Sequence, residues 1–224
     1  MVNVKLIIFD MDGTLYNLDD VVQMNYNMQV DFYSHQMRLS KEEVIQIFLE
    51  NNIYPTITEK SKSATEFFVR SGIESDKWNS YRENHFDVSM INREYAASES
   101  IIKSFASIAP IILLSSNSMR NMSKILTHIG LRQELFEDII CSDHKHSDGT
   151  FNKLDEMRRI IEKYNVEPAN VLSIGDRYKT DIEPLLSLGG LGVLANGPQD
   201  LCKIFEALQN KSLDGIRAFG LSRD

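Results

Sequence analysis

The chain has 224 residues, of which 42% are hydrophobic and 25% charged, proportions ordinary for a globular protein that buries a sizeable core. Its formal net charge of −8 argues against nucleic-acid binding through a broad basic surface, although local cations or a metal can still attract an anionic substrate. Without a signal-peptide pattern or an apolar run long enough to span a bilayer, and with only Cys141 and Cys202, we expect a cytoplasmic protein without membrane insertion, disulfide framework or zinc site.

The first element predicted is a strand at residues 6–9, whose sequence Leu-Ile-Ile-Phe is typical of a strand buried on both faces inside a parallel sheet. Asp10 and Asp12 follow it directly, at the end of the strand where open α/β folds bind ligands. Two carboxylates this close need a cation or a shared proton to offset their repulsion. Gly13 permits a tight turn and Thr14 adds a hydroxyl, so we expect a metal-assisted site here.

Residues 17–98 show helical patterns and no convincing strand, which predicts an all-helical insertion. Segments 40–43 and 63–66 match the capping box, in which Ser precedes Glu by three positions at the start of a helix. Trp78 and the other aromatic residues of the insertion are expected to form its core. Some could instead face a substrate, with Tyr16, Tyr26 and Tyr81 as candidates.

From about residue 98 helical and strand patterns alternate, which predicts right-handed crossovers and a parallel sheet. We therefore expect an α/β fold with a Rossmann-like core formed by residues 1–16 and 99–224. After Ser212 only a weak helical signal remains, at Ile216 and Phe219. The later strands are expected at residues 111–114, 139–141, 171–174 and 192–194.

Further polar residues follow these later strands, at the edge of the sheet where Asp10 is expected. The carboxylates of such a cluster can hold a hard cation such as Mg²⁺ through oxygen. Hydroxyls, backbone N–H groups and a lysine can neutralise phosphate oxygens, while one Asp attacks phosphorus and a neighbouring Asp manages the proton. The residues concerned are Ser116, Asn117, Lys153, Asp176 and Asp181.

This arrangement resembles the haloacid dehalogenase-like superfamily of hydrolases, specifically its phosphatases with a helical cap of the C1 type inserted after the first strand. Four motifs occur in the family's order: Asp10-Met11-Asp12-Gly13-Thr14, then Ser116, then Lys153, then Gly175-Asp176 with Asp181. The resemblance spans about residues 4–198. The catalytic motifs carry it, whereas the insertion matches a cap in position and helicity alone.

The resemblance implies a role for each motif residue. Asp10 would be the nucleophile that forms an aspartyl-phosphate, and Asp12 the general acid and then base, with its backbone carbonyl in the Mg²⁺ shell. Lys153 would steady the nucleophile and the phosphate. Asp176 would bind Mg²⁺ together with Asp10, and Asp181 would support the cluster. The phosphate-binding residues would be Thr14, Ser116, Asn117 and Lys153.

Two of these assignments have a neighbouring alternative. Ser115 could replace Ser116, because two serines follow the strand at residues 111–114. Lys145 could replace Lys153, because Leu154 stands where many relatives have Pro. The second motif can therefore be assigned to either of two adjacent serines, and the third motif to either of two lysines.

The function that the resemblance implies is a Mg²⁺-dependent phosphatase of small phosphorylated metabolites. A phosphomutase or nucleotidase of the same superfamily remains an alternative, whereas Asp12 argues against a dehalogenase, which lacks the second acid. An inactive binding module is disfavoured because no motif residue is lost. His144 and His146 are expected in an exposed loop rather than at a metal. The substrate and the oligomeric state do not follow from the sequence.

Overall fold

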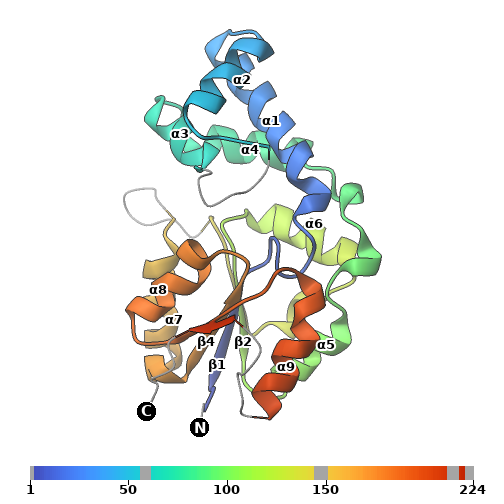
Figure 1. Cartoon of the computed structure of the whole chain (residues 1–224), viewed down its shortest axis with the longest axis vertical. Helices are drawn as coiled ribbons and strands as arrows, with labels where there is room; N and C mark the ends of the chain where they lie inside the picture. The colour runs from blue at the N-terminus through green and yellow to red at the C-terminus, as the bar shows by residue number, and fades with distance from the viewer. Residues whose placement is uncertain (1–2, 56–61, 144–150, 211–216, 220–224) are drawn as a thin grey trace. The chain divides into compact units, whose positions relative to one another are not determined.

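The structure is a computed structural model that describes residues 3–55, 62–143, 151–210 and 217–219. The chain divides into two compact units, whose segments can be found in Figure 1 by the colour of their residue numbers. One unit is residues 19–90, and the other combines residues 1–18 with 91–224. The helical insertion expected at residues 17–98 is a somewhat longer segment than the first of these units.

The larger unit contains a six-stranded sheet in the order β3-β2-β1-β4-β5-β6. Strands β1 to β5 pair in parallel, and β6 pairs antiparallel to β5. Strand order reverses between β1 and β4, so the carboxyl ends of these two strands form a topological switch point. The strands are β1 (Leu6–Phe9), β2 (Ile111–Leu114), β3 (Asp138–Ile140), β4 (Val171–Gly175), β5 (Leu191–Leu194) and β6 (Arg217–Phe219).

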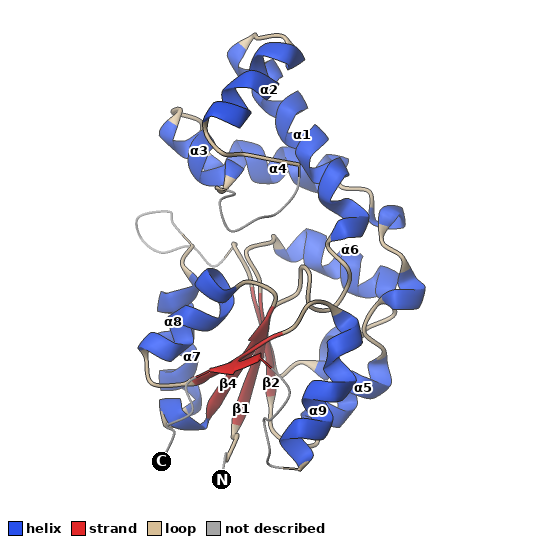
Figure 2. Cartoon of the chain, viewed as in Figure 1, coloured by secondary structure: helices blue, strands red, loops and turns tan. Residues whose placement is uncertain are grey.

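Helices cover both faces of this sheet, with α7 and α8 on one side and α5 and α9 on the other (Figure 2). They are α5 (Glu99–Ala106), α6 (Met119–Ile129), α7 (Lys153–Tyr164), α8 (Glu183–Ser187) and α9 (Leu201–Gln209). The short 3-10 turns are η1 (Val88–Met90), η2 (Arg93–Tyr95), η3 (Gln133–Leu135), η4 (Pro168–Asn170) and η6 (Pro198–Asp200). The α/β, Rossmann-like fold expected from the sequence is therefore confirmed.

All four residues of strand β1 are buried, which accounts for its continuous apolar sequence. Successive side chains of a strand point to opposite faces. Leu6 and Ile8 join the core cluster that includes residues of α7 and α8. Phe9 packs against Phe105 of α5 with 5.0 Å between ring centroids, and Phe105 in turn contacts Phe205 of α9 at 5.5 Å. The strand is thus covered on both sides, as its sequence predicts.

The C-terminal tail differs from its expected weak helical character. Residues 217–219 form β6, in which Phe219 pairs with Gly192 and Arg217 with Leu194. An edge strand offers unpaired backbone N–H and C=O groups, and three residues that satisfy them gain more than an isolated helical turn would. The helical prediction at Phe219 is therefore wrong, and Ile216 lies outside the described residues.

Helices joined by loops make up the smaller unit over its described residues. Ser40 makes both hydrogen bonds of the capping box with Glu43, whereas at Ser63 the side chain accepts from the backbone N–H of Glu66. Trp78 is buried and its ring lies near other aromatic rings, so it belongs to the core of the unit as predicted. No described helix of the chain has the length and apolar character to cross a membrane. The helices are α1 (Asp19–Met37), α2 (Lys41–Glu50), α3 (Ala64–Arg70) and α4 (Ser75–His85).

Candidate active site

The loop after β1 lies against the end of β4. The backbone N–H of Asp10 donates to the carbonyl oxygen of Ile174 at 2.9 Å. Gly13 turns the loop with a φ of +81°, and a Cβ atom at this position would stand 2.4 Å from Oδ2 of Asp176. Only glycine accepts both the backbone conformation and this close approach. The motif of the first strand and the motif of the fourth strand therefore meet at the switch point.

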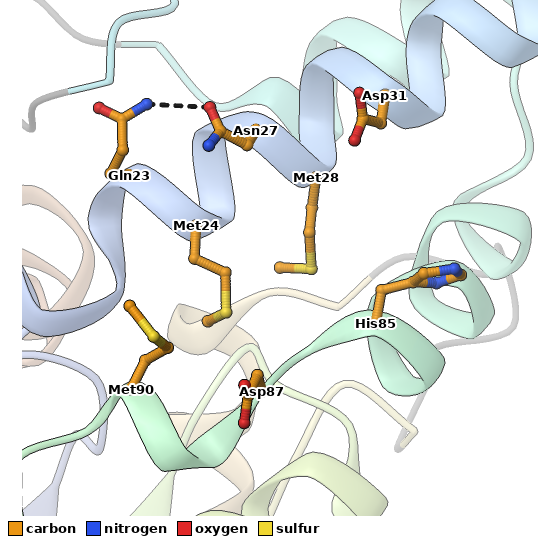
Figure 3. Close-up of a pocket in the computed structure, with 8 residues that line it drawn as sticks. All are labelled: Gln23, Met24, Asn27, Met28, Asp31, His85, Asp87 and Met90. Carbon is orange, nitrogen blue, oxygen red and sulfur yellow. Dashed lines mark hydrogen bonds between the residues drawn. The ribbon is translucent and has the colours of Figure 1, made fainter.

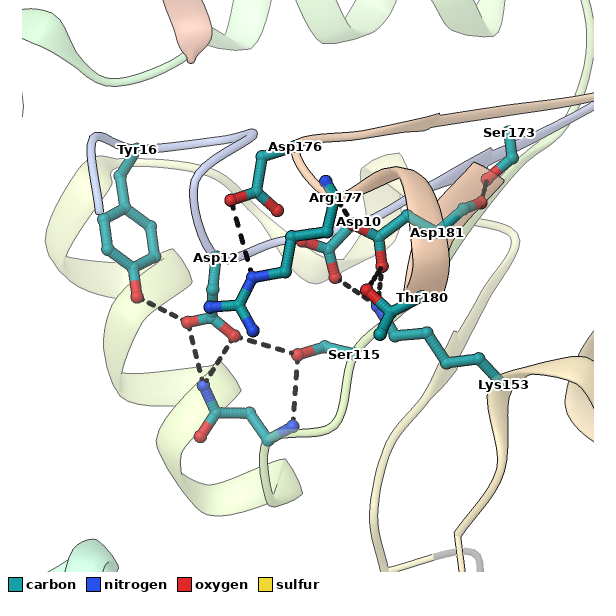
Figure 4. Close-up of polar contacts among 11 residues, drawn as sticks. Asp10, Asp12, Tyr16, Ser115, Lys153, Ser173, Asp176, Arg177, Thr180 and Asp181 are labelled. Atoms are coloured by element: carbon teal, nitrogen blue, oxygen red, sulfur yellow. Dashed lines mark hydrogen bonds and ion pairs between the residues drawn. The ribbon is translucent and has the colours of Figure 1, made fainter. Parts of the chain in front are cut away.

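Lys153, the first residue of α7, forms ion pairs with two carboxylates of this site (Figure 4). Its Nζ lies 2.6 Å from Oδ1 of Asp10 and 2.8 Å from Oδ1 of Asp181. The Lys153 side chain is 10% exposed, and those of Asp10 and Asp181 are 8% and 3% exposed. This is a buried network rather than a surface salt bridge. The alternative, Lys145, lies outside the described residues, as do His144 and His146.

Asp181 lies on a short π-helix, η5 (Tyr178–Ile182), and both of its carboxylate oxygens accept hydrogen bonds. Oδ1 accepts a hydrogen bond from Thr180 Oγ1 at 3.0 Å in addition to the one from Lys153. Oδ2 accepts from the backbone N–H of Arg177 at 2.9 Å. By contrast, Oδ2 of Asp176 has Arg177 Nε at 3.9 Å. Asp181 thus holds the network together, and Asp176 retains lone pairs for a ligand.

Three carboxylates of the site come close enough to share one cation. One oxygen each from Asp10, Asp176 and Asp181 lies within 4.8 Å of the others. Oxygen donors of this kind suit a hard divalent ion. A metal ion can therefore be held between the ends of β1 and β4.

The pKa values reflect the crowding of acids in this network. Burial raises the pKa of Asp10 well above its usual value against the lowering effect of Lys153, and the nearby carboxylates of Asp181, Asp176 and Asp12 raise it further. Burial raises the pKa of Asp176 to about 7 despite Arg177. For Asp181 burial also opposes ionisation, but Lys153 and the hydrogen bonds outweigh it and lower the pKa. The cluster therefore carries fewer negative charges than its composition suggests, unless a cation joins it.

The Asp12 side chain lies in a separate group of hydrogen bonds (Figure 4). Its Oδ1 accepts from the hydroxyl of Tyr16, and its Oδ2 from Ser115 Oγ at 3.2 Å. The Asn117 amide group donates to both oxygens, at 3.0 and 3.1 Å. Tyr16, Ser115 and Asn117 are all buried. Asp12 is thus oriented by three donors rather than by the metal-site carboxylates.

The residues expected to bind phosphate have unlike surroundings. Ser116 is exposed, whereas Ser115 is buried and contacts Asp12, so the alternative by one residue is the serine inside this hydrogen-bond group. Thr14 is fully buried, and its hydroxyl has no hydrogen-bond partner among the described residues. Asn117 is buried and bonded to Asp12. The sequence predicts Tyr16 as a core residue or as a residue that faces the substrate, whereas in the structure its hydroxyl contacts Asp12, four positions earlier across the turn at Gly13.

The helical unit contains a separate pocket of about 380 Å³ between α1 and the segment that follows α4 (Figure 3). Three methionine side chains give it an apolar surface, and two aspartates and a histidine add polar groups. The lining residues are Gln23, Met24, Asn27, Met28, Asp31, His85, Asp87 and Met90.

Comparison with known proteins identifies the family to which the sequence is similar. The sequence model of the haloacid dehalogenase-like hydrolases matches residues 4–189. No curated protein matches the chain. Among solved structures, a HAD phosphatase from Thermococcus onnurineus is similar with a TM-score of 0.62 and 18% identity, over 92% of this chain and 98% of that one.

Two further structures have the same fold. CbbY from Rhodobacter sphaeroides, in complex with phosphate, has a TM-score of 0.57 and 14% identity over 86% of either chain. A 2-haloacid dehalogenase from Pseudomonas syringae pv. Tomato DC3000 has a TM-score of 0.54 and 14% identity, over 93% of this chain and 100% of that one. At this level of identity the likeness concerns the fold alone, because one fold supports several reactions.

Proposed function

Because the chain belongs to the haloacid dehalogenase-like hydrolases, we propose that it is a Mg²⁺-dependent phosphatase of small phosphomonoesters that forms an aspartyl-phosphate at Asp10. The observation that carries the proposal is the buried network in which Lys153 Nζ lies 2.6 Å from Asp10, beside Asp176 and Asp181. A carboxylate held by an ammonium group at the switch point of an α/β sheet is suited to act as a nucleophile.

In the proposed reaction Lys153 holds Oδ1 of Asp10, and we assign the attack on phosphorus to Oδ2. The bond from Asp10 to phosphorus forms while the bond from phosphorus to the ester oxygen breaks, and Asp12 passes a proton to the departing oxygen. Water then attacks the aspartyl-phosphate, Asp12 takes the proton of that water, and inorganic phosphate leaves. Lys153 also offsets negative charge on the phosphoryl oxygens during both steps.

The residues present fit the Mg²⁺ ion that the family resemblance implies. Asp10 and Asp176 would hold it through carboxylate oxygens, with the backbone carbonyl of Asp12 as a further ligand. Asp181 would support the site, since both of its oxygens already accept hydrogen bonds. When bound, the ion supplies positive charge that stabilises the phosphoryl oxygens.

The raised pKa values give this metal site a testable pH dependence. In the metal-free protein the folded state keeps a proton on Asp176 that the unfolded chain has released, from about pH 4 to about pH 7, and the raised pKa of Asp10 acts in the same direction. Stability therefore falls as pH rises through this window. Mg²⁺ binds the ionised carboxylates and displaces those protons. We expect millimolar MgCl₂ to raise Tm by a few degrees at about pH 8 and much less at about pH 5.

Thermal unfolding of the same samples checks this expectation, with NaCl at equal ionic strength as the control. The Asp176→Asn variant should lose most of the Mg²⁺-dependent rise at the higher pH. A rise in Tm of the same size at both pH values, or one that NaCl reproduces, would contradict a Mg²⁺ site built on these carboxylates.

The activity itself is tested with a panel of phosphomonoesters and p-nitrophenyl phosphate, assayed for released inorganic phosphate. We expect hydrolysis with MgCl₂ and its loss with EDTA, restored when Mg²⁺ is added in excess. Conversion of a sugar phosphate to an isomer without phosphate release would favour the phosphomutase alternative, and hydrolysis restricted to nucleoside monophosphates the nucleotidase. Turnover of a 2-haloacid instead of any phosphate ester would refute the proposal.

We further propose that the helical insertion, expected at residues 17–98, serves as the cap that selects the leaving group. Its described helices, which lie in the sequence between β1 and β2, support this, because the resemblance places a helical cap at that position. The cytoplasmic location expected from the sequence stays a prediction.

A further inference from the structure

Tyr16 lies outside the four motifs, yet its hydroxyl donates a hydrogen bond to the carboxylate of Asp12 (Figure 4). The two residues are also backbone neighbours, because a parallel β-bridge joins them across the turn at Gly13. Tyr16 is only 1% exposed, so water cannot readily replace its hydroxyl. We propose that Tyr16 is a positioning residue that holds the carboxyl group of Asp12 for proton transfer to the leaving group. The inference rests on the phosphatase function proposed above.

The three donors around Asp12 are not equivalent. The Asn117 amide nitrogen can only donate, and it reaches both carboxylate oxygens. The hydroxyl hydrogens of Tyr16 and Ser115 rotate, so each can donate to a lone pair of the Asp12 carboxyl group in its ionised and its protonated form, which leaves the acid proton free to point at the leaving group. These two residues can therefore stay bonded to Asp12 before and after it gives up its proton. They hold its orientation through the transfer.

Tyr16 is better suited than Ser115 to hold that orientation. Its ring is buried in the first loop, and the backbone there is fixed by two hydrogen bonds: Leu15 N–H donates to Met11 O at 2.9 Å, and Ala97 N–H to Leu15 O at 2.8 Å. A buried aromatic ring has few rotamers, so its hydroxyl oxygen occupies a defined place. A displacement of about 1 Å in a reacting group can cost about a hundredfold in rate.

The effect of losing the Tyr16 hydroxyl on the rate depends on the leaving group. When the bond from phosphorus to the ester oxygen breaks, an aliphatic alkoxide needs the proton of Asp12, whereas p-nitrophenolate is a stable anion without it. A Tyr16→Phe substitution removes the hydroxyl and keeps the ring. We expect kcat/KM to fall about tenfold or more for alkyl phosphates and by less than about threefold for p-nitrophenyl phosphate.

The value of kcat/KM is the right measure, because it includes no step after the leaving group departs. The matched control is Tyr164→Phe, which alters a partly buried tyrosine at the end of α7. We expect this variant to leave kcat/KM unchanged for both substrates. Asp12→Asn serves as the comparator and should show the same split between the substrates with a larger loss. A merely structural role of Tyr16 would lower kcat/KM equally for both substrates.

An equal loss for both substrates, or no loss, would overturn the inference for Tyr16. Wild-type enzyme without activity on any phosphomonoester would instead refute the proposed function. In that case crystal structures of the wild type and Tyr16→Phe still test the positioning, without any assay. We expect the Asp12 carboxylate to rotate or adopt several rotamers in the variant, and an unchanged single orientation would overturn the inference.

Discussion

Replacing Asp10 with Asn is expected to reduce phosphomonoester hydrolysis to background while the protein stays folded. A carboxamide cannot form the aspartyl-phosphate, so we expect a loss on the order of 10⁴-fold or more in kcat. Folding should survive, because burial already disfavours the charge of Asp10 and raises its pKa. Lys153 keeps its partner Asp181 at 2.8 Å.

The measurement is phosphate release together with a far-UV circular dichroism spectrum and Tm of each variant. Asp138→Asn is the matched control, because Asp138 lies at the start of β3 and pairs with the exposed Lys163. It makes the same chemical change at the amino end of β3, outside the hydrogen-bonded groups of the site, and we expect nearly full activity. Hydrolysis that persists in the folded Asp10→Asn variant would contradict the assignment of Asp10 as the nucleophile.

Replacing Lys153 with Met is expected to have the largest effect on stability. Met keeps most of the apolar stem but removes the ammonium group that faces Asp10 and Asp181, both nearly buried. Breaking a buried ion pair by removing one partner costs about 3–5 kcal/mol, because the remaining charges lose their compensation. Activity should also be lost, since the ion pair that Lys153 makes with the Asp10 carboxylate is then gone.

The loss of stability should depend on pH. Burial opposes the charge of Lys153, but the two carboxylates outweigh it and raise its pKa, so the ammonium is present throughout the working range. Without it the folded-state pKa values of Asp10 and Asp181 rise, and the folded variant binds protons that the unfolded chain has released. We therefore expect the variant to lose stability, relative to the wild type, as pH rises from about 5 to about 8.

Urea unfolding of metal-free protein at the two pH values measures this difference. Lys163→Met on the same helix is the matched control: its ion pair with Asp138 joins side chains that are 60% and 28% exposed, and such pairs contribute at most about 1 kcal/mol. Equal costs for the Lys153 and Lys163 variants would show that the buried network does not stabilise the fold.

Several elements could be predicted from residue pattern alone. The strands expected at residues 6–9 and 111–114 have the same bounds as β1 and β2. The strand expected at 139–141 is displaced by one residue from β3 (Asp138–Ile140). Continuous apolar runs bounded by polar residues define a buried strand clearly, whereas the shorter run around β3 leaves its ends undefined.

The conformation of the tail and the choice between the two serines depended on contacts that no local pattern contains. Residues 217–219 are a strand because β5 offers an edge to pair with. Ser115 rather than Ser116 contacts Asp12 because neighbouring side chains at the end of a strand point in opposite directions. Ser115 and Ser116 are adjacent residues of the same type, so the sequence alone does not tell which hydroxyl contacts Asp12.

The sequence by itself determined the order of the motifs and the edge of the sheet where they gather, because parallel strands bring their carboxyl ends to one side. Only the tertiary structure decided which atoms meet there: Lys153 bridges Asp10 and Asp181, and Tyr16 reaches Asp12. Hydrogen bonds form or fail within a fraction of an ångström. Packing of residues distant in the chain sets that distance, and no spacing along the chain specifies it.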